Sequence, residues 1–204
     1  METEEQQVEQ IKAWWAEHGR GIIAGLVIGF ALFYGWQYYD NSVRAGQEAQ
    51  AEQYAAIIAE LEQDAEAASG SAQTFIAENG DAIMGQLAAF ELARAAIQND
   101  DLAQAASLYQ GVREQAEGSV KGVAAVREAR VRLAQQDFSG ALDALTVAST
   151  VAGFEGMSHE LRGDVLQAQG DLAGARSAYQ AAIDTVEYQS QLAEIKLKSI
   201  PADS

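Results

Sequence analysis

Ser158, His159 and Asp164 are of the residue types that serve as nucleophile, general base and orienting carboxylate in hydrolases. Their spacing would place all three along a single helix, and His159 is better explained as a surface or packing residue. Acidic pairs such as Glu60 with Glu62 have the composition of a general acid–base site, but such pairs usually belong to solvated helix faces or caps. We therefore expect no catalytic residues and no enzyme activity.

The composition also argues against cofactors and nucleic acid. The 204 residues include no Cys and two His, which excludes disulfides, thiolate zinc sites and iron–sulfur clusters and disfavours a multi-histidine metal site. The chain contains neither a G-x-x-x-x-G-K-[ST] loop nor EF-hand spacing. Thirty acidic residues against 13 Lys and Arg give a formal charge of −17, whereas phosphate binding needs clustered basic residues. We expect no metal, no cofactor and no nucleic-acid partner.

The elements that position these side chains are predicted to be helices throughout. The single proline, Pro201, lies four residues from the end, and the chain is rich in Ala, Glu, Gln and Leu. Hydrophobic residues make up 49% of the chain, which is too many for a disordered protein. The fold class we predict is all-α.

A stretch of 19 uncharged residues, Gly21–Tyr39, is bounded by Arg20 and Asp40. As a helix it would span about 28 Å, close to the thickness of a bilayer hydrocarbon core. A cleaved signal peptide is the alternative. Residues 2–20 carry five Glu against one Lys and one Arg, and aromatic residues crowd the end of the stretch, which favours an uncleaved transmembrane anchor.

Positive charges near the anchor indicate its orientation. Lys12 and Arg20 precede it and only Arg44 follows closely, which favours a cytoplasmic N-terminus. We thus expect a cytoplasmic stub at 1–20, a transmembrane helix at 21–39 and an external domain at 40–204.

Gly21, Gly25 and Gly29 follow one another at intervals of four residues and would lie on one face of that helix. Such a face lets a second membrane helix approach closely, although glycine is also common in membrane helices in general. We predict a transmembrane packing face at these three glycines.

Three later segments share one layout, in which a small residue is followed eight positions on by Asp, then by a bulky apolar residue, an Ala and a second large residue. They comprise Ala93, Asp101, Leu102, Ala105 and Tyr109; Ala129, Asp137, Phe138, Ala141 and Leu145; and Gly163, Asp171, Leu172, Ala175 and Tyr179. The Asp residues are 36 and 34 positions apart, which is the period of tetratricopeptide repeats.

Each unit is expected to form two helices that approach closely at the small residues. The Asp is suited to begin the second helix, because its carboxylate can accept free backbone N–H groups. Gly170 supplies the turn before the third Asp, where the other units have Asp100 and Gln136. We predict a tetratricopeptide-like α-solenoid preceded by helices at Gln47–Asp64 and Ser71–Asn79. A terminal helix within Tyr188–Ile200, with apolar Leu192, Ile195 and Leu197, should cap it.

The concave side of such an array is lined by the first helix of each pair. Its first two units would form an apolar strip with two arginines, and we predict a partner-binding groove at Leu87, Phe90, Arg94, Val123, Val126 and Arg130. The third unit would add Met157, Glu160, Asp164 and Gln167. Alternatively, the terminal helix folds back over the strip and makes these residues part of the core.

The chain resembles the family of single-pass ancillary subunits of the bacterial SecYEG translocon, of the YfgM type. The resemblance rests on residues 8–20 ending in WAEHGR, the glycine-punctuated anchor, FIAEN at 75–79, ELA at 91–93, ARV at 129–131, LRGD at 161–164, GD at 170–171 and GARSAY at 174–179. It extends over nearly the full chain in the same order, with the greatest departure at 47–70.

This resemblance implies a bacterial inner-membrane protein with a cytoplasmic N-terminus and a periplasmic tetratricopeptide-like domain. It implies an accessory role at the Sec translocon, a membrane-anchored prolyl-isomerase-like periplasmic chaperone as a partner, and exported proteins as further partners. A membrane-tethered scaffold for assembly or signalling unrelated to export is the alternative, because such repeats serve many partners.

Overall fold

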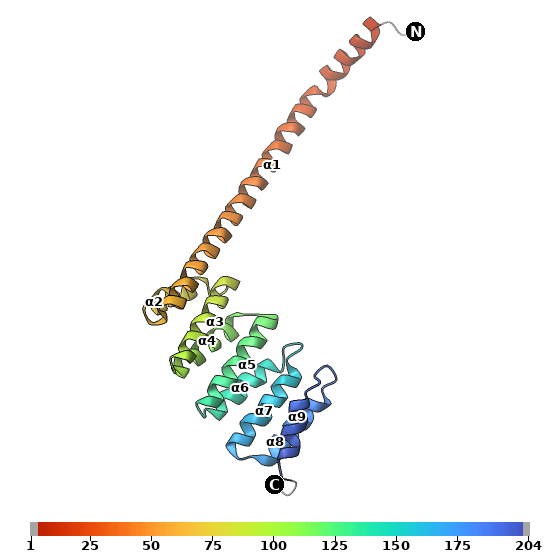
Figure 1. The fold of residues 1–204 in the computed structure, drawn as a ribbon. Coiled ribbons are helices and arrows are strands. Elements are labelled where there is room, and N and C mark those ends of the chain that lie inside the picture. The colour runs from red at the N-terminus through yellow and green to blue at the C-terminus, as the bar shows by residue number, and fades with distance from the viewer. Residues whose placement is uncertain (1–3, 202–204) are drawn as a thin grey trace. The chain divides into compact units, whose positions relative to one another are not determined.

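The computed structural model of the chain describes residues 4–201, and every regular element in that range is a helix (Figure 1). This confirms the all-α prediction. The chain divides into two compact units between Ala51 and Glu52, described separately below. The helices are α1 (Glu4–Gln63), α2 (Ala65–Asn79), α3 (Ile83–Gln98), α4 (Leu102–Gln115), α5 (Gly118–Ala134), α6 (Phe138–Ala148), α7 (Glu155–Gln169), α8 (Leu172–Asp184) and α9 (Gln191–Ser199).

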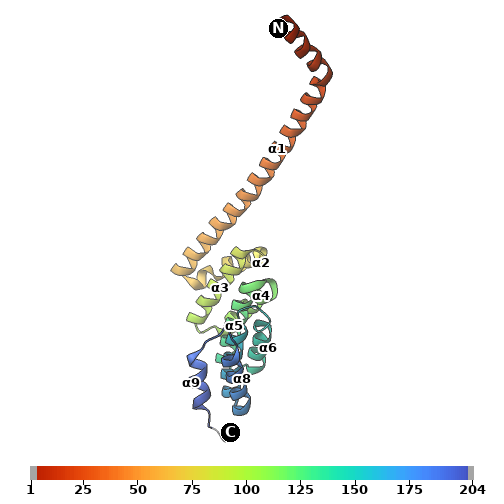
Figure 2. The ribbon, with the colours of Figure 1, turned by 90° about the vertical axis from the view of Figure 1, so that its right-hand side faces the viewer.

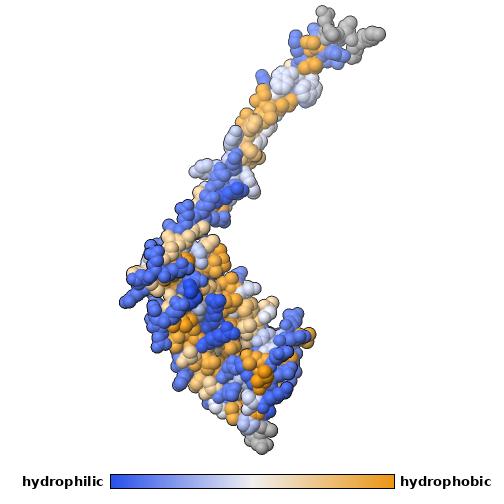
Figure 3. Space-filling view, in the orientation of Figure 1, coloured by the Kyte–Doolittle hydropathy of each residue, from blue (hydrophilic) through white to orange (hydrophobic). Residues whose placement is uncertain are grey.

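The first unit contains the N-terminal part of α1, which carries the predicted anchor. Figure 3 shows hydrophobic residues along the middle of this helix between hydrophilic stretches. Apolar side chains there are open to solvent, including Leu32 at 70% and Trp36 at 74% exposure. Among the described residues, α1 is long and apolar enough to cross a membrane. The exposure is what an anchor requires, because lipid takes the place of a protein core around it.

The predicted helix at Gln47–Asp64 is not a separate element, because α1 continues without a break from Glu4 to Gln63. The short helix predicted at Ser71–Asn79 begins earlier, at Ala65. Asp64 explains that start: its backbone is extended, and its carboxylate accepts hydrogen bonds from the N–H groups of Glu66 and Ala67.

In the second unit, α3 with α4, α5 with α6 and α7 with α8 are the predicted helix pairs, and they lie next to one another along the array (Figure 1). The repeated small residues are buried where the helices meet: Ala93, Ala105, Ala141 and Ala175 have no exposed surface. At Gly163 an added Cβ would lie 2.4 Å from the ring of Tyr179. The small residues therefore set the close approach of paired helices, as predicted.

The three repeated Asp residues cap the second helices. Oδ1 of Asp101, Asp137 and Asp171 accepts a hydrogen bond from the N–H of the residue three positions on, at 2.9, 3.0 and 2.9 Å. The preceding residues turn the chain with positive φ: 61° at Asp100, 60° at Gln136 and 89° at Gly170. Asp100 and Gln136 thus adopt the left-handed conformation that Gly170 enters without strain.

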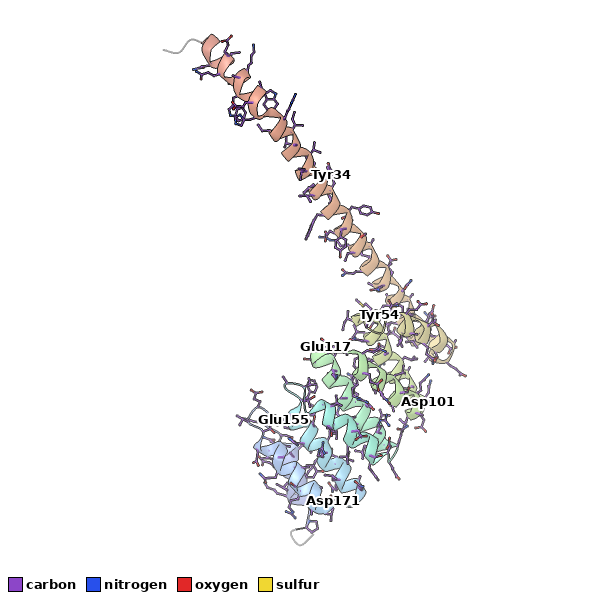
Figure 4. All side chains as sticks on the ribbon, turned by 180° about the vertical axis from the view of Figure 1, so that it is seen from behind. Tyr34, Tyr54, Asp101, Glu117, Glu155 and Asp171 are labelled. Carbon is purple, nitrogen blue, oxygen red and sulfur yellow. The ribbon has the colours of Figure 1, made fainter. Side chains whose placement is uncertain are left out.

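The repeated turns give the array two distinct edges. Figure 4 shows Asp101 and Asp171, within the pairs, at one edge, and Glu117 and Glu155, between pairs, at the other. In Figure 2, α3 and α9 lie on one side of the array and α4 and α6 on the opposite side. The side that carries α3, α5, α7 and α9 is called the inner face below.

The terminal helix α9 packs against α8, as the predicted capping role requires. Ala193 and Ile200 are buried, and Ile200 belongs to a cluster with Ala175 and Tyr179. Leu192 and Ile195, which the sequence suggested as packing residues, are 53% and 63% exposed. The packed side of the terminal segment is therefore formed by Ala193, Lys196, Leu197 and Ile200, while Leu192 and Ile195 point to solvent.

Candidate partner-binding surface

The predicted groove residues on α3 and α5 separate into two layers. Phe90 and Val126 are 8% and 4% exposed and belong to the hydrophobic core, which corrects the expectation that they line an open strip. Leu87 is 38% exposed and Val123 half-buried. Phe90 and Val126 are buried by helix packing, because the sides of α3 and α5 on which they lie also contact the neighbouring helices.

Arg94 and Arg130 are both exposed on the inner face. The side chain of Arg94 is 57% exposed, and its Nε donates to Glu91 Oε2 at 2.7 Å, one helical turn away. Arg130 lies one helical turn after Val126 on α5. The two arginines therefore flank the buried Phe90 and Val126 rather than lying in a continuous apolar strip.

Arg127 is a third cation on this face, and it was not among the residues predicted from the sequence. Its guanidinium carbon lies 4.9 Å from the centroid of the Phe90 ring, and the Phe90 and Tyr109 rings are 5.7 Å apart. Burial raises the pKa of Tyr109, and nearby Arg127 opposes that rise in part. Helical spacing could have predicted this position, because Arg127 lies four residues after Val123 and three before Arg130, on the same side of the helix.

The inner face of the third repeat is covered by the chain itself. On α7, Glu160 accepts hydrogen bonds from Tyr188 and Ser190 at 2.8 and 2.6 Å, and Lys196 Nζ of α9 donates to it at 2.9 Å. Lys196 also contacts Asp164, at 2.8 Å. The terminal segment thus occupies the third-repeat part of the predicted groove.

These contacts change the acidity of the groups involved. Burial would raise the pKa of Glu160, but hydrogen bonds from Ser190, Lys196 and Tyr188 hold it below its ordinary value. Burial lowers the pKa of Lys196, but the two carboxylates outweigh it and leave it raised. Both shifts favour the charged forms, so the salt bridge is intact at neutral pH.

A second buried ion network lies between the first two repeats. Glu128 on α5 is 1% exposed, and it accepts from Arg113 Nε on α4 at 2.6 Å and Arg132 Nε at 2.8 Å. Arg132 also bonds Asp137, the cap of α6, at 2.7 Å and Gln110 at 2.8 Å. All of these charges are satisfied within the protein, so this cluster is structural and leaves no group free for a ligand.

The side chains considered for catalysis serve other purposes. The Ser158 hydroxyl is buried and donates to the Phe154 carbonyl at 2.7 Å. His159 Nε2 lies 3.9 Å from Glu155, and Asp164 accepts from Tyr179 and Lys196. Among the side chains of residues 7–201 there is no group of three or more His, Asp or Glu suited to hold a metal ion.

In α1, an apolar groove of about 630 Å³ runs over Gly25 and Gly29, two of the three residues of the predicted transmembrane packing face. Ile22, Leu26, Phe30 and Phe33 form its walls. A Cβ added at Gly21, Gly25 or Gly29 would meet nothing within 4 Å. The absence of side chains at these positions therefore leaves room into which another helix could fit.

Similarity to known proteins extends over nearly the full length of the chain, including α1 and the repeats. The tetratricopeptide repeat-like domain family model matches residues 12–202. The ancillary SecYEG translocon subunit of Escherichia coli K12 is 28% identical over 202 residues, covering 98% of this chain and 97% of that protein. The subunit of the same name from Haemophilus influenzae is 28% identical over 200 residues, covering 97% of each.

Among solved structures, that of a MamA RS-1 ArsTM double mutant aligns with a TM-score of 0.51 and 17% identity, over 66% of this chain and 74% of that one. At that identity the likeness bears on the fold alone. The chain belongs to the tetratricopeptide repeat-like domain family, and over about 98% of its length it is homologous to the ancillary SecYEG translocon subunits of the YfgM type.

Proposed function

We propose that the chain is a membrane-anchored, non-enzymatic interaction protein that serves as an accessory subunit of the Sec translocon. The observation that carries this proposal is the full-length similarity to ancillary SecYEG translocon subunits, which includes both the long apolar helix and the repeats. A repeat array with exposed arginines on one face and no catalytic grouping found among the described residues suits protein binding.

The proposed topology has a cytoplasmic stub at 1–20, a transmembrane helix at 21–39 and a periplasmic domain at 40–204 in the inner membrane. Lys12 and Arg20 before the apolar stretch support this orientation. Protease added to cells with a permeable outer membrane should digest the repeat domain and spare the stub. Digestion of the stub alone would reverse the topology.

In this proposal, the glycine face contacts a helix of a membrane partner, and the repeat domain binds a periplasmic chaperone that receives exported proteins. The chaperone we expect is membrane-anchored and prolyl-isomerase-like. Leu87, Arg94, Val123 and Arg130 would make the contact from the inner face, while Phe90 and Val126 support it from beneath.

Crosslinking of the full-length chain in native membranes, followed by identification of the captured proteins, tests this function. SecYEG subunits and one membrane-anchored chaperone should be enriched over a control that carries an unrelated anchor. Capture of assembly or signalling proteins in place of SecYEG would contradict the proposal.

A variant pair tests the glycine face within the same experiment. Gly25→Leu fills the groove and should reduce capture of membrane partners. Ala31→Leu is the control, because Ala31 is also exposed on α1 but lies about 120° around the helix from Gly25. Equal losses in both variants would leave the glycine face without a specific role.

A further inference from the structure

Two arginines on α5 carry charge that the protein does not neutralise. Among the side chains of residues 7–201, neither Arg127 nor Arg130 forms an ion pair with a carboxylate, although acidic residues exceed basic ones by 17 in the whole sequence. By contrast, Arg113, Arg132 and Lys196 are each held by buried carboxylates. Arg127 and Arg130 are both exposed and lie three residues apart on one side of α5, so their charges act together on that surface.

The unpaired arginines share the inner face with accessible apolar surface. Arg127 lies against the Phe90 ring, and one turn away from it on the same stripe of α5 is half-buried Val123. On α3, Leu87 and Ile97 are 38% and 40% exposed. Figure 3 shows strongly hydrophilic residues in the middle of this face with hydrophobic residues beside them.

The other charges on this face do not cancel the two arginines. Glu91 already pairs with Arg94, and Glu160 and Asp164 are engaged by Lys196. The cover formed by α9 stays on the third repeat, where its charged contacts are. The first two repeats therefore present guanidinium groups next to apolar side chains.

We propose that this surface binds an acidic amphipathic segment of a partner protein, whose carboxylates pair with Arg127 and Arg130 and whose apolar residues cover Leu87 and Val123. Arginine suits this task because its planar group can bind a carboxylate with two parallel hydrogen bonds. A long polyanion is disfavoured, since the chain's total charge of −17 repels it, whereas a segment with two or three carboxylates feels mainly the local cations. This inference rests on the proposed partner-binding function and specifies the chemistry of the partner.

The test uses the full chain in detergent micelles and a fluorescent synthetic peptide of about 16 residues, with Leu at helical spacing and Glu on the flanks. A matched peptide carries Gln in place of every Glu. Fluorescence anisotropy should show at least about tenfold tighter binding of the Glu peptide. That affinity should fall several-fold between about 0.05 M and about 0.5 M NaCl, because exposed ion pairs are screened by salt.

Variants of the chain locate the contact. Arg130→Glu should weaken binding of the Glu peptide at least about tenfold, whereas Arg127→Lys, which keeps the charge but loses the planar group, should weaken it less. Arg162→Glu is the matched control and should bind normally, because Arg162 points toward Thr146 on α6. Circular dichroism melting of each variant separates a lost contact from a lost fold.

Equal binding of the Gln peptide would overturn the inference, as would normal binding by a folded Arg130→Glu variant. Comparable binding of single-stranded DNA of equal charge would also overturn it, because the surface would then be a general anion site. These outcomes are independent of the crosslinking result: loss of SecYEG capture with intact peptide binding removes the translocon role and keeps the acidic-segment site.

Discussion

Replacement of Glu128 by Gln should destabilise the repeat domain strongly, although the two side chains have nearly the same volume. Glu128 is 1% exposed and accepts hydrogen bonds from Arg113 of α4 and Arg132 of α5, so it joins two repeats through charged contacts. A Gln amide keeps one acceptor oxygen but directs an N–H₂ group toward a guanidinium donor. The substitution therefore leaves buried positive charge without its counter-ion.

The magnitude follows from that burial. Removal of one partner from a buried ion pair costs about 3–5 kcal/mol, and retention of one acceptor places Gln near the lower end, at about 3 kcal/mol. The second unit, Glu52–Ser204, has 153 residues, a size at which 1 kcal/mol shifts the melting temperature by about 2–4 °C. We expect the melting temperature to fall by about 6–12 °C.

The assay is circular dichroism melting of the full chain in detergent micelles, with Glu114→Gln as the matched control. Glu114 also faces Arg113, but at 3.9 Å and with 57% of its side chain exposed, so its loss should cost less than about 1 kcal/mol. The double variant Arg113→Met, Glu128→Met should recover part of the stability, since it removes Glu128 together with Arg113 and leaves Arg132 paired with Asp137. A Glu128→Gln melting temperature within about 2 °C of the parent would refute the reasoning.

Three further predictions concern the helix contacts, the turns and the terminal helix. Gly163→Ala should lower the free energy of unfolding by about 1–3 kcal/mol in denaturant titrations, because the added Cβ would collide with the Tyr179 ring. Gly111→Ala, in open space on α4, is the control and should raise the free energy of unfolding by up to about 1 kcal/mol. Equal effects of the two substitutions would contradict the close packing at Gly163. Gln136→Gly should raise the free energy of unfolding by about 0.5–1 kcal/mol in the same titrations, since Gln136 has a φ of 60°, a conformation that Gly adopts without strain. A lower free energy of unfolding would show that contacts of the Gln136 side chain outweigh the relief of backbone strain. Because the folded-state pKa of Glu160 is lowered, its stabilising effect is present above its unfolded pKa of about 4.3 and is lost as pH falls through the folded pKa. Hydrogen exchange of the α9 amides should therefore speed up in that acid range, whereas in the Glu160→Gln variant these amides should exchange fast already at neutral pH. If parent and variant exchange alike at neutral pH, Glu160 does not hold α9 in place.

The two buried ion networks have different consequences for the array. The Glu128 network lies between the first and second repeats and includes the cap of α6, so it couples neighbouring units. The Glu160 network fastens α9 to α7 and covers the third repeat. The stability of a repeat array includes the contacts between neighbouring units, and here charged hydrogen bonds are among those contacts, beside the apolar clusters.

The sequence by itself determined the features that depend on local or periodic patterns. An uninterrupted apolar stretch is enough to predict a helix of membrane-spanning length, because bilayer thickness and helix rise are fixed quantities. The 34- to 36-residue spacing of Asp101, Asp137 and Asp171 was likewise enough to place the caps, and Gly170 was correctly predicted to turn the chain before the third of them. Capping and left-handed turns are decided within a few residues, so the sequence pattern carries them.

Tertiary structure alone decided which side chains on the inner face are available. Phe90 on α3 and Val126 on α5 each lie on the same side of their helix as exposed neighbours. Only the packing of adjacent helices decides that these two are buried while Leu87 stays accessible. Glu128 lies in a run of alternating charged and apolar residues typical of a solvated face, yet α4 brings Arg113 against it from 15 positions away. Helical periodicity fixes which residues share a side of one helix, but contacts between helices decide which of them meet water.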